Sequence, residues 1–230
     1  MTKFSFDIVG FDLDGTFLDT SGDLAAAVNH ALGAAGRAPL AIDQLKPMIG
    51  GGAKKMLTHA LQATGGCTDE ELERLYALLL DHYDAHIAVH SHPFPGAVAA
   101  IEALAARGVK IAIVTNKFER FAEKLLRTLG LRHLFDTVIG GDTLGPGLAK
   151  PNRAPIDEMI RRCGGGSAAF VGDSSFDIEA ARAAGIPNIA VSFGFLTSPV
   201  EHLEADAVID SYDDLIPALE RLKRRHKATG

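Results

Sequence analysis

Short apolar runs alternate along the chain with longer segments in which apolar residues recur at helical spacing. Most of these runs are apolar at nearly every position, which is typical of parallel strands buried on both faces. The segments between them are long enough for crossover helices, so the pattern predicts a doubly wound α/β sheet. The strand candidates are Phe6–Phe11, Lys110–Thr115, Thr137–Ile139, Ala168–Val171, Asn188–Val191 and Ala207–Ile209.

One interval breaks this alternation, because roughly 95 residues separate the first strand candidate from the second, where a crossover unit takes a few tens. The helical patterns within it run over 23–35, 53–63 and 69–87. The last begins with a capping-box sequence at Thr68–Glu71, and its apolar stripe requires a partner surface. We therefore predict two domains: an α/β core of residues 1–18 and 91–230, and a helical cap inserted as residues 19–90.

Two carboxylates follow directly after the first strand candidate, in the motif Asp12-Leu13-Asp14-Gly15-Thr16. At positions i and i+2 they can converge on one pocket at the carboxyl edge of the sheet, and Gly15 permits a sharp turn. Taken alone, the motif is also compatible with a capped turn whose acids are solvated. Right-handed crossovers, however, predict the strand order 3-2-1-4-5, in which Asp12 and Asp173 flank a ligand crevice.

Further polar residues come after the other strand candidates: Thr115, Asn116, Lys150, Asp173 and Asp177. Carboxylates that converge with a single lysine repel one another unless a cation joins them, and oxygen ligands favour a hard divalent ion such as Mg²⁺. We therefore predict a magnesium site formed by Asp12, Asp173 and a group from Asp14. Asp177, one helical turn beyond Asp173, is expected to hold a metal-bound water or Lys150.

These residue types also indicate a reaction. A carboxylate can attack phosphorus to form an aspartyl-phosphate, which divides a difficult hydrolysis into two displacements, and Asp12 is the candidate nucleophile. Asp14 is placed to protonate the departing alkoxide and then to deprotonate the attacking water. The candidates for holding the phosphoryl oxygens, where charge develops, are Thr115, Asn116 and Lys150.

The motifs resemble, in their order along the chain, those of haloacid dehalogenase-type hydrolases of the phosphatase branch. They are an apolar strand leading to D-x-D-G-T, a strand ending in Thr, a Lys-Pro pair, and Gly-Asp followed four residues on by Asp. The resemblance spans nearly the whole chain and implies a cap between the first two strands. The roles it implies are nucleophile for Asp12, acid/base for Asp14, phosphate binding for Thr115 and Lys150, and magnesium binding for Asp173.

Four shorter stretches are similar to the phosphoglycolate phosphatase subfamily, which makes 2-phosphoglycolate the leading substrate: Ile49–Ala53, Val89–Ser91, Thr115–Lys117 and Val191–Phe195. Two departures leave the substrate open, because Gly51 stands where that subfamily has Asn and Asn152-Arg153 replace its Asp-Pro. Gly50, Gly51 and Lys54 form a candidate substrate loop in the cap. Lys54 or Lys55 would bind the carboxylate of glycolate there, the alternative being a solvated helix face.

Other functions share parts of this pattern. A pyrophosphatase or a sugar phosphomutase of the same superfamily can use the same nucleophile and cap. A phospho-accepting receiver, which is a non-hydrolytic binding module, also places acids, Thr and Lys on a parallel sheet, but it needs one small domain and no insertion over the crevice. A dehalogenase is disfavoured because a departing halide needs no proton from Asp14.

Composition narrows the class of protein further. Among 230 residues, 47% are hydrophobic and 23% charged, which excludes disorder as the main state. The net charge of −6 disfavours nucleic acid as a partner, and no apolar run approaches the roughly 18 residues of a membrane span. The spacing of Cys67 and Cys163 suggests neither a disulfide framework nor a zinc ribbon. We expect a cytoplasmic enzyme, a monomer or homodimer, whose partner is a small phosphorylated metabolite.

Overall fold

Six parallel strands form the central sheet of the computed structural model. They are β1 (Ile8–Phe11), β4 (Lys110–Val114), β5 (Thr137–Ile139), β6 (Ala168–Gly172), β7 (Asn188–Val191) and β8 (Ala207–Ile209). Their spatial order is β5-β4-β1-β6-β7-β8, so the predicted order 3-2-1-4-5 is confirmed and the sixth strand extends it at the far edge. The α/β fold class is therefore confirmed as well.

The structure describes residue 4 and residues 6–228, with the backbone alone for 223–228. Residues 1–3, 5, 229 and 230, which the predicted core includes at its two ends, lie outside the described residues. None of the helices in the described part of the chain has the length and apolar character needed to cross a bilayer.

Burial on both faces explains why β1 is apolar throughout. Successive side chains of a strand point to opposite faces, so Val9 and Phe11 join the main core cluster while Ile8 joins a second cluster on the other face. Ile8 pairs with Lys110 on one side and with Ala168 on the other. This register aligns the carboxyl ends of β1, β4 and β6 at one edge of the sheet.

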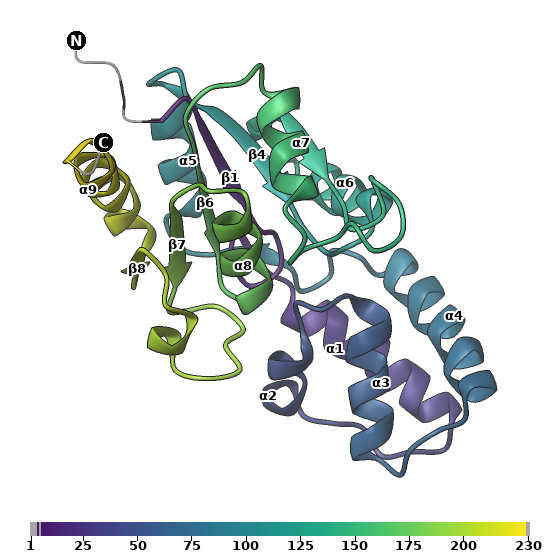
Figure 1. The fold of residues 1–230 in the computed structure, drawn as a ribbon. Coiled ribbons are helices and arrows are strands. Elements are labelled where there is room, and N and C mark those ends of the chain that lie inside the picture. Colours follow the sequence, from purple (N-terminus) through teal and green to yellow (C-terminus); the bar gives the residue numbers. More distant parts are fainter. Residues whose placement is uncertain (1–3, 5, 229–230) are drawn as a thin grey trace.

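Helices cover both faces of the sheet (Figure 1). Helices α5 (Ala97–Ala105), α6 (Glu119–Thr128) and α9 (Leu215–Ala228) contribute to the main core cluster on one face. Helices α7 (Ala154–Arg162) and α8 (Ser175–Ala183) contribute to the cluster on the opposite face. The helices thus form a layer on each face of the sheet.

Four α-helices lie between residues 19 and 92 and group together at the carboxyl end of the sheet (Figure 1). They are α1 (Ser21–Ala34), α2 (Ile42–Leu45), α3 (Ala53–Ala63) and α4 (Asp69–Ala85). Leu75 and Leu79 of α4 are fully buried, as its apolar stripe predicts. The side chain of Thr68 accepts a hydrogen bond from the Glu71 amide at 3.2 Å, which confirms Thr68 as the N-cap within the predicted capping box of α4.

The chain leaves the sheet for these helices and returns from them at one place. Strand β2 (Leu18–Asp19) pairs antiparallel with β3 (His92–Pro93), a two-residue ladder that the apolar pattern is too short to reveal. The carboxylate of Asp23 also accepts hydrogen bonds from the amides of His90 and Ser91, both at 2.9 Å. These contacts lie near residues 18 and 91, where the sequence places the boundaries between core and cap. The division into two domains stays a prediction.

Candidate active site

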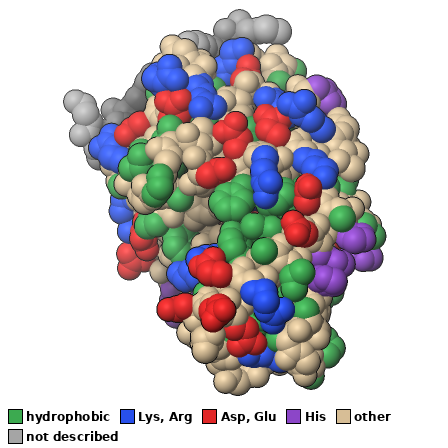
Figure 2. Space-filling model, turned by 90° about the vertical axis from the view of Figure 1, so that its right-hand side faces the viewer, with side chains coloured by type: hydrophobic (Ala, Val, Ile, Leu, Met, Phe, Trp, Pro, Cys, Tyr) green, Lys and Arg blue, Asp and Glu red, His purple; other side chains and the backbone are tan. Residues whose placement is uncertain are grey.

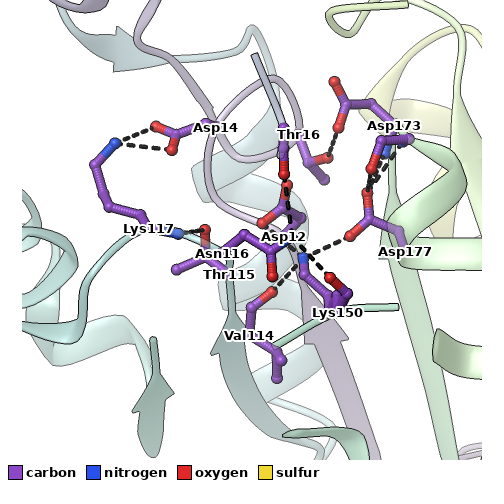
Figure 3. A network of polar contacts seen from close by, with 12 residues as sticks. Asp12, Asp14, Thr16, Val114, Thr115, Asn116, Lys117, Lys150, Asp173 and Asp177 are labelled. Atoms are coloured by element: carbon purple, nitrogen blue, oxygen red, sulfur yellow. Dashed lines mark hydrogen bonds and ion pairs between the residues drawn. The ribbon is translucent and has the colours of Figure 1, made fainter. Parts of the chain in front are cut away.

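The predicted polar residues converge where the parallel strands end (Figure 3). Asp12 follows β1, Thr115 follows β4, Asp173 follows β6, and Lys150 lies in the connection after β5. All four are buried. Residues that are widely separated in the sequence therefore share one water-poor pocket, in which charge interactions are stronger than at the surface.

The loop after β1 holds Asp12 by backbone geometry. The Asp12 amide donates to the Val171 carbonyl at 2.9 Å, which continues the sheet ladder by one residue. Gly15 has a φ of +84°, and a Cβ atom built on it would lie 2.2 Å from Oδ2 of Asp173. Only glycine fits both the left-handed backbone and this close approach, so Gly15 lets the two carboxylates come together.

Lys150 is the cation of this cluster. Its Nζ lies 2.9 Å from Oδ1 of Asp12 and 2.5 Å from Oδ1 of Asp177, and it donates to the Val114 carbonyl at 2.7 Å. Burial by itself lowers the pKa of Lys150, but the two carboxylates outweigh it and raise that pKa above its ordinary value. The ammonium thus stays charged and fixed in direction by three partners.

The carboxyl group of Asp12 is strongly perturbed by its surroundings. Burial raises its pKa to about 7, against the opposing attraction of Lys150. The nearby charges of Asp177 and Asp14 push the pKa in the same direction as burial. A carboxyl in this state gains from a further cation that stabilises its ionised form.

Asp173 and Asp177 are positioned by hydrogen bonds from the chain around them. Asp173 accepts from the Phe195 amide at 2.7 Å and from the hydroxyl of Thr16 at 3.3 Å. Asp177 accepts from the amide and hydroxyl of Ser174 at 3.0 and 2.6 Å, forming a capping box at the start of α8. Asp177 therefore holds Lys150, one of the two tasks expected of it.

A group of carboxylate oxygens suited to a metal ion is present in the described part of the chain. Asp12, Asp173 and Asp177 each offer one oxygen, and these atoms lie within 4.8 Å of one another. Three acids face one ammonium here, and burial raises the pKa of Asp173 well above its usual range. The donor set is oxygen only and its negative charge is in excess, which fits a hard divalent cation.

Asp14 points away from that group. Its two oxygens accept from Nζ of Lys117 at 2.8 and 2.7 Å, and Oδ1 also accepts from the hydroxyl of Thr20 at 2.7 Å. Its side chain is thus absent from the carboxylate group around Asp173, and the predicted metal contact of Asp14 would have to come from another of its atoms. Sequence reasoning left Lys117 without a role, although its place directly after Thr115-Asn116 at a strand end was a usable signal.

The other predicted residues lie around the rim. The side-chain nitrogen of Asn116 donates to the carbonyls of Gly50 and Lys150, at 3.1 and 3.0 Å. Asn116 therefore joins the glycine loop of the insertion to the loop that carries the lysine. Lys54 forms an ion pair with Glu73 and is 48% exposed, and Lys55 lies 4.9 Å from the ring centre of Phe176.

A cavity of about 370 Å³ lies between the sheet edge and the inserted helices. Its floor includes Asp12, Asp14, Thr115 and Lys150, and the glycines at 50–52 line it from the insertion. The walls are largely apolar and include Met56, Tyr76, Leu80, Phe118, Phe121 and Phe176. Figure 2 shows apolar side chains gathered between acidic and basic ones on the face that lies at the right of Figure 1.

Comparison with known proteins agrees with this geometry. Residues 9–191 match the model of the family described as haloacid dehalogenase-like hydrolase. The chain is 40% identical over 213 residues to a phosphoglycolate phosphatase of Agrobacterium fabrum, covering 91% of this chain and 90% of that protein. It is 39% identical over 221 residues to a phosphoglycolate phosphatase of Mesorhizobium japonicum, covering 94% and 96%.

Solved structures show the same fold. A predicted phosphoglycolate phosphatase of Haemophilus somnus superposes with a TM-score of 0.84 at 29% identity, covering 94% of this chain and 98% of that one. The chain belongs to the haloacid dehalogenase-like hydrolase family. Within this family it is a phosphatase, an enzyme that hydrolyses phosphoric monoesters.

Proposed function

We propose that this phosphatase is Mg²⁺-dependent, acts through an aspartyl-phosphate on Asp12, and has 2-phosphoglycolate as its leading substrate. The observation that carries the mechanism is the placement of Asp12 against Lys150 at the floor of a cavity, beside two further carboxylates. The substrate is proposed because the two relatives named above are phosphoglycolate phosphatases that align over nine-tenths or more of this chain.

In the first displacement, an oxygen of Asp12 attacks phosphorus and forms a P–O bond while the bond to the ester oxygen breaks. Asp14 donates a proton to the departing alkoxide, which leaves as an alcohol. Thr115 and Lys150 hold the phosphoryl oxygens as charge shifts onto them. Asn116 acts here by fixing the loop of Lys150, because its side-chain nitrogen already donates to two carbonyls.

In the second displacement, water attacks the phosphorus of the aspartyl-phosphate and the acyl-phosphate bond breaks. Asp14, now ionised, removes a proton from that water. Inorganic phosphate leaves, and Asp12 returns to its carboxylate form. Asp12 needs to be ionised to attack, and Lys150 favours that form against the effect of burial.

The residues that would hold Mg²⁺ are Asp12, Asp173 and a group from Asp14. When bound, the ion neutralises negative charge on the phosphoryl oxygens and on the clustered carboxylates. Asp177 is assigned to Lys150, which it contacts at 2.5 Å. The oxygens of Asp12 and Asp173 lie together with one of Asp177, and this excess of carboxylates supports a cation beside Asp12 and Asp173.

The decisive experiment measures phosphate release with Mg²⁺ from 2-phosphoglycolate, a panel of small phosphate esters, and pyrophosphate. We expect Asp12→Asn to lower kcat by about 10⁴-fold or more while circular dichroism stays unchanged. Asp81→Asn, which changes an exposed acid of α4, is the matched control. Turnover retained by Asp12→Asn would refute the mechanism, and a preference for pyrophosphate or isomerisation of a sugar phosphate would replace the proposed substrate.

A further inference from the structure

Lys117 is a buried cation of the cavity that the proposed reaction leaves without a task. Its side chain is only 6% exposed, and its Nζ lies 2.8 and 2.7 Å from the two oxygens of Asp14. The ammonium also lies 4.8 Å from the ring centre of Tyr83. A lysine is seldom buried to this degree unless it is paired, and a buried charge acts strongly on any anion that reaches it.

The position of Lys117 relative to Asp12 decides which part of a substrate it meets. In Figure 3 the Lys117–Asp14 pair lies on one side of Asp12, and Asp173 and Asp177 lie on the other. The group that departs from phosphorus must reach Asp14 to receive its proton. The atoms attached to the ester oxygen are therefore placed next to Lys117.

We propose that Lys117 and Tyr83 form a subsite for a second negative charge on the substrate, a carboxylate separated from the ester oxygen by one carbon atom. This inference rests on the proposed function, because the assignment of Asp14 as the acid orients the ester. In 2-phosphoglycolate the carboxylate stands at that separation. The subsite thus selects phosphorylated 2-hydroxy acids among small phosphate esters.

Tyr83 supplies a second, independent observation. Its side chain lines the cavity and is 3% exposed, and its hydroxyl lies near the Lys117 ammonium but has no hydrogen-bond acceptor among the described residues. A buried hydroxyl without an acceptor is costly unless a partner binds there. A carboxylate held by Lys117 would accept that O–H, so the two groups together provide a charge and a directed donor.

The lysines of the glycine loop are weaker candidates for this role. Lys54 is half exposed and already forms an ion pair with Glu73 of α4. Lys55 is exposed, and its ammonium lies over the ring of Phe176. Exposed charges are screened by water and salt. Lys117, in contrast, is buried and lines the cavity beside Asp14.

The test pairs two substrates with two forms of the enzyme. 2-Phosphoglycolate is compared with 2-hydroxyethyl phosphate, which has the same chain length and no carboxylate, in the wild type and in Lys117→Met. We expect the preference for 2-phosphoglycolate, as a ratio of kcat/KM values, to fall by about 10- to 100-fold in the variant, mainly through KM. If the variant acts only by freeing Asp14, kcat/KM falls equally for both substrates and that ratio stays unchanged.

Three further variants sharpen the result. Lys117→Arg keeps the charge and is expected to retain most of the preference, and Tyr83→Phe is expected to lower it by about tenfold. Lys54→Met removes a lysine charge from the glycine loop and should leave the ratio unchanged. If Lys117→Met lowers kcat/KM equally for both substrates, or if Lys54→Met abolishes the preference instead, the subsite is not at Lys117.

A binding measurement separates failure of the subsite from failure of the proposed function. Calorimetry on Asp12→Asn gives Kd for both esters without turnover, with and without Lys117→Met. If the wild type releases no phosphate from 2-phosphoglycolate, the proposed substrate fails. Whether or not phosphate is released, the subsite fails if Lys117→Met leaves the ratio of the two Kd values unchanged.

Discussion

The floor of the cavity and its outer wall, which is the glycine loop with Lys54, hold their charges in opposite ways. At the floor, Lys150 is buried and contacts Asp12, Asp177 and a main-chain carbonyl at 2.5 to 2.9 Å. At the wall, Lys54 is half exposed and pairs with Glu73, a residue of the same insertion. The floor thus joins four segments of the chain, whereas the wall completes its pairing within the insertion.

This difference separates the reaction from the choice of substrate. Buried groups fixed by several partners need little reorganisation when charge moves during the reaction. Exposed groups that are paired only with one another can change at small cost in stability. We therefore expect the floor to be intolerant of substitution and the outer wall to be tolerant. Lys117, buried but reaching between the two regions, lies at their border.

The largest effect is expected from Lys150→Met, which changes the floor. The change removes a donor from the phosphoryl group and leaves Asp12 and Asp177 without their cation, so we expect kcat/KM to fall by about 10³-fold. Thermal unfolding should also register a loss of about 3 kcal/mol or more. Lys124→Met removes a half-exposed lysine paired with Asp84 and serves as the control. A folded Lys150→Met variant that keeps a tenth of its activity would contradict the role of the floor.

Gly15→Ala tests the close approach at the floor with a single methyl group. A Cβ there would lie 2.2 Å from Oδ2 of Asp173 on a backbone with φ +84°, so the carboxylate must shift. We expect kcat/KM to fall by about 10- to 100-fold. Gly33→Ala adds the same methyl group inside α1, with nothing within 4 Å, and should keep full activity. Equal activity of the two variants would show that this contact is unimportant.

The pH dependence of stability tests the burial of the Asp12 carboxyl group at the floor. In the folded protein the pKa of Asp12 is raised from 3.8 to about 7, so between those values the folded state binds a proton that the unfolded state has lost. The contribution of Asp12 to the free energy of unfolding is therefore fully present below pH 3.8 and is lost as pH rises through about 7.

The Asp12→Asn variant has no carboxyl group at position 12 to titrate, so it does not lose stability in this way as pH rises. In EDTA, the Tm of Asp12→Asn minus that of the wild type should therefore grow as pH rises from 4 to 7. Addition of Mg²⁺ at pH 7 should shrink the difference, because the ion stabilises the ionised carboxylate. A difference that stays constant over this pH range would count against the perturbed carboxyl.

The smallest effect is expected at the outer wall. Lys54→Ala removes an exposed ion pair with Glu73, and such pairs contribute about 0 to 1 kcal/mol. We expect kcat/KM for 2-phosphoglycolate to stay within about twofold and Tm to change little. A loss of tenfold or more in KM would restore Lys54 as the residue that binds the carboxylate of glycolate.

The ends of the strands were predictable because buried parallel strands demand apolar residues at successive positions. Asp12, Thr115 and Asp173 each interrupt or follow such a run, and the handedness of crossovers then places them at one edge. The two-residue strands β2 and β3 were not predictable, since two residues carry no periodicity. Their pairing depends on residues more than seventy positions apart.

The sequence alone determined the α/β class, the strand order, the family and the candidate set of reacting side chains, because these follow from apolar periodicity and from motifs at strand ends. Only the tertiary structure decided which charges pair. Lys117 reaches Asp14 across 103 positions, while Lys54 meets Glu73 within the insertion. Such pairing depends on distances and burial, which local spacing along the chain does not encode.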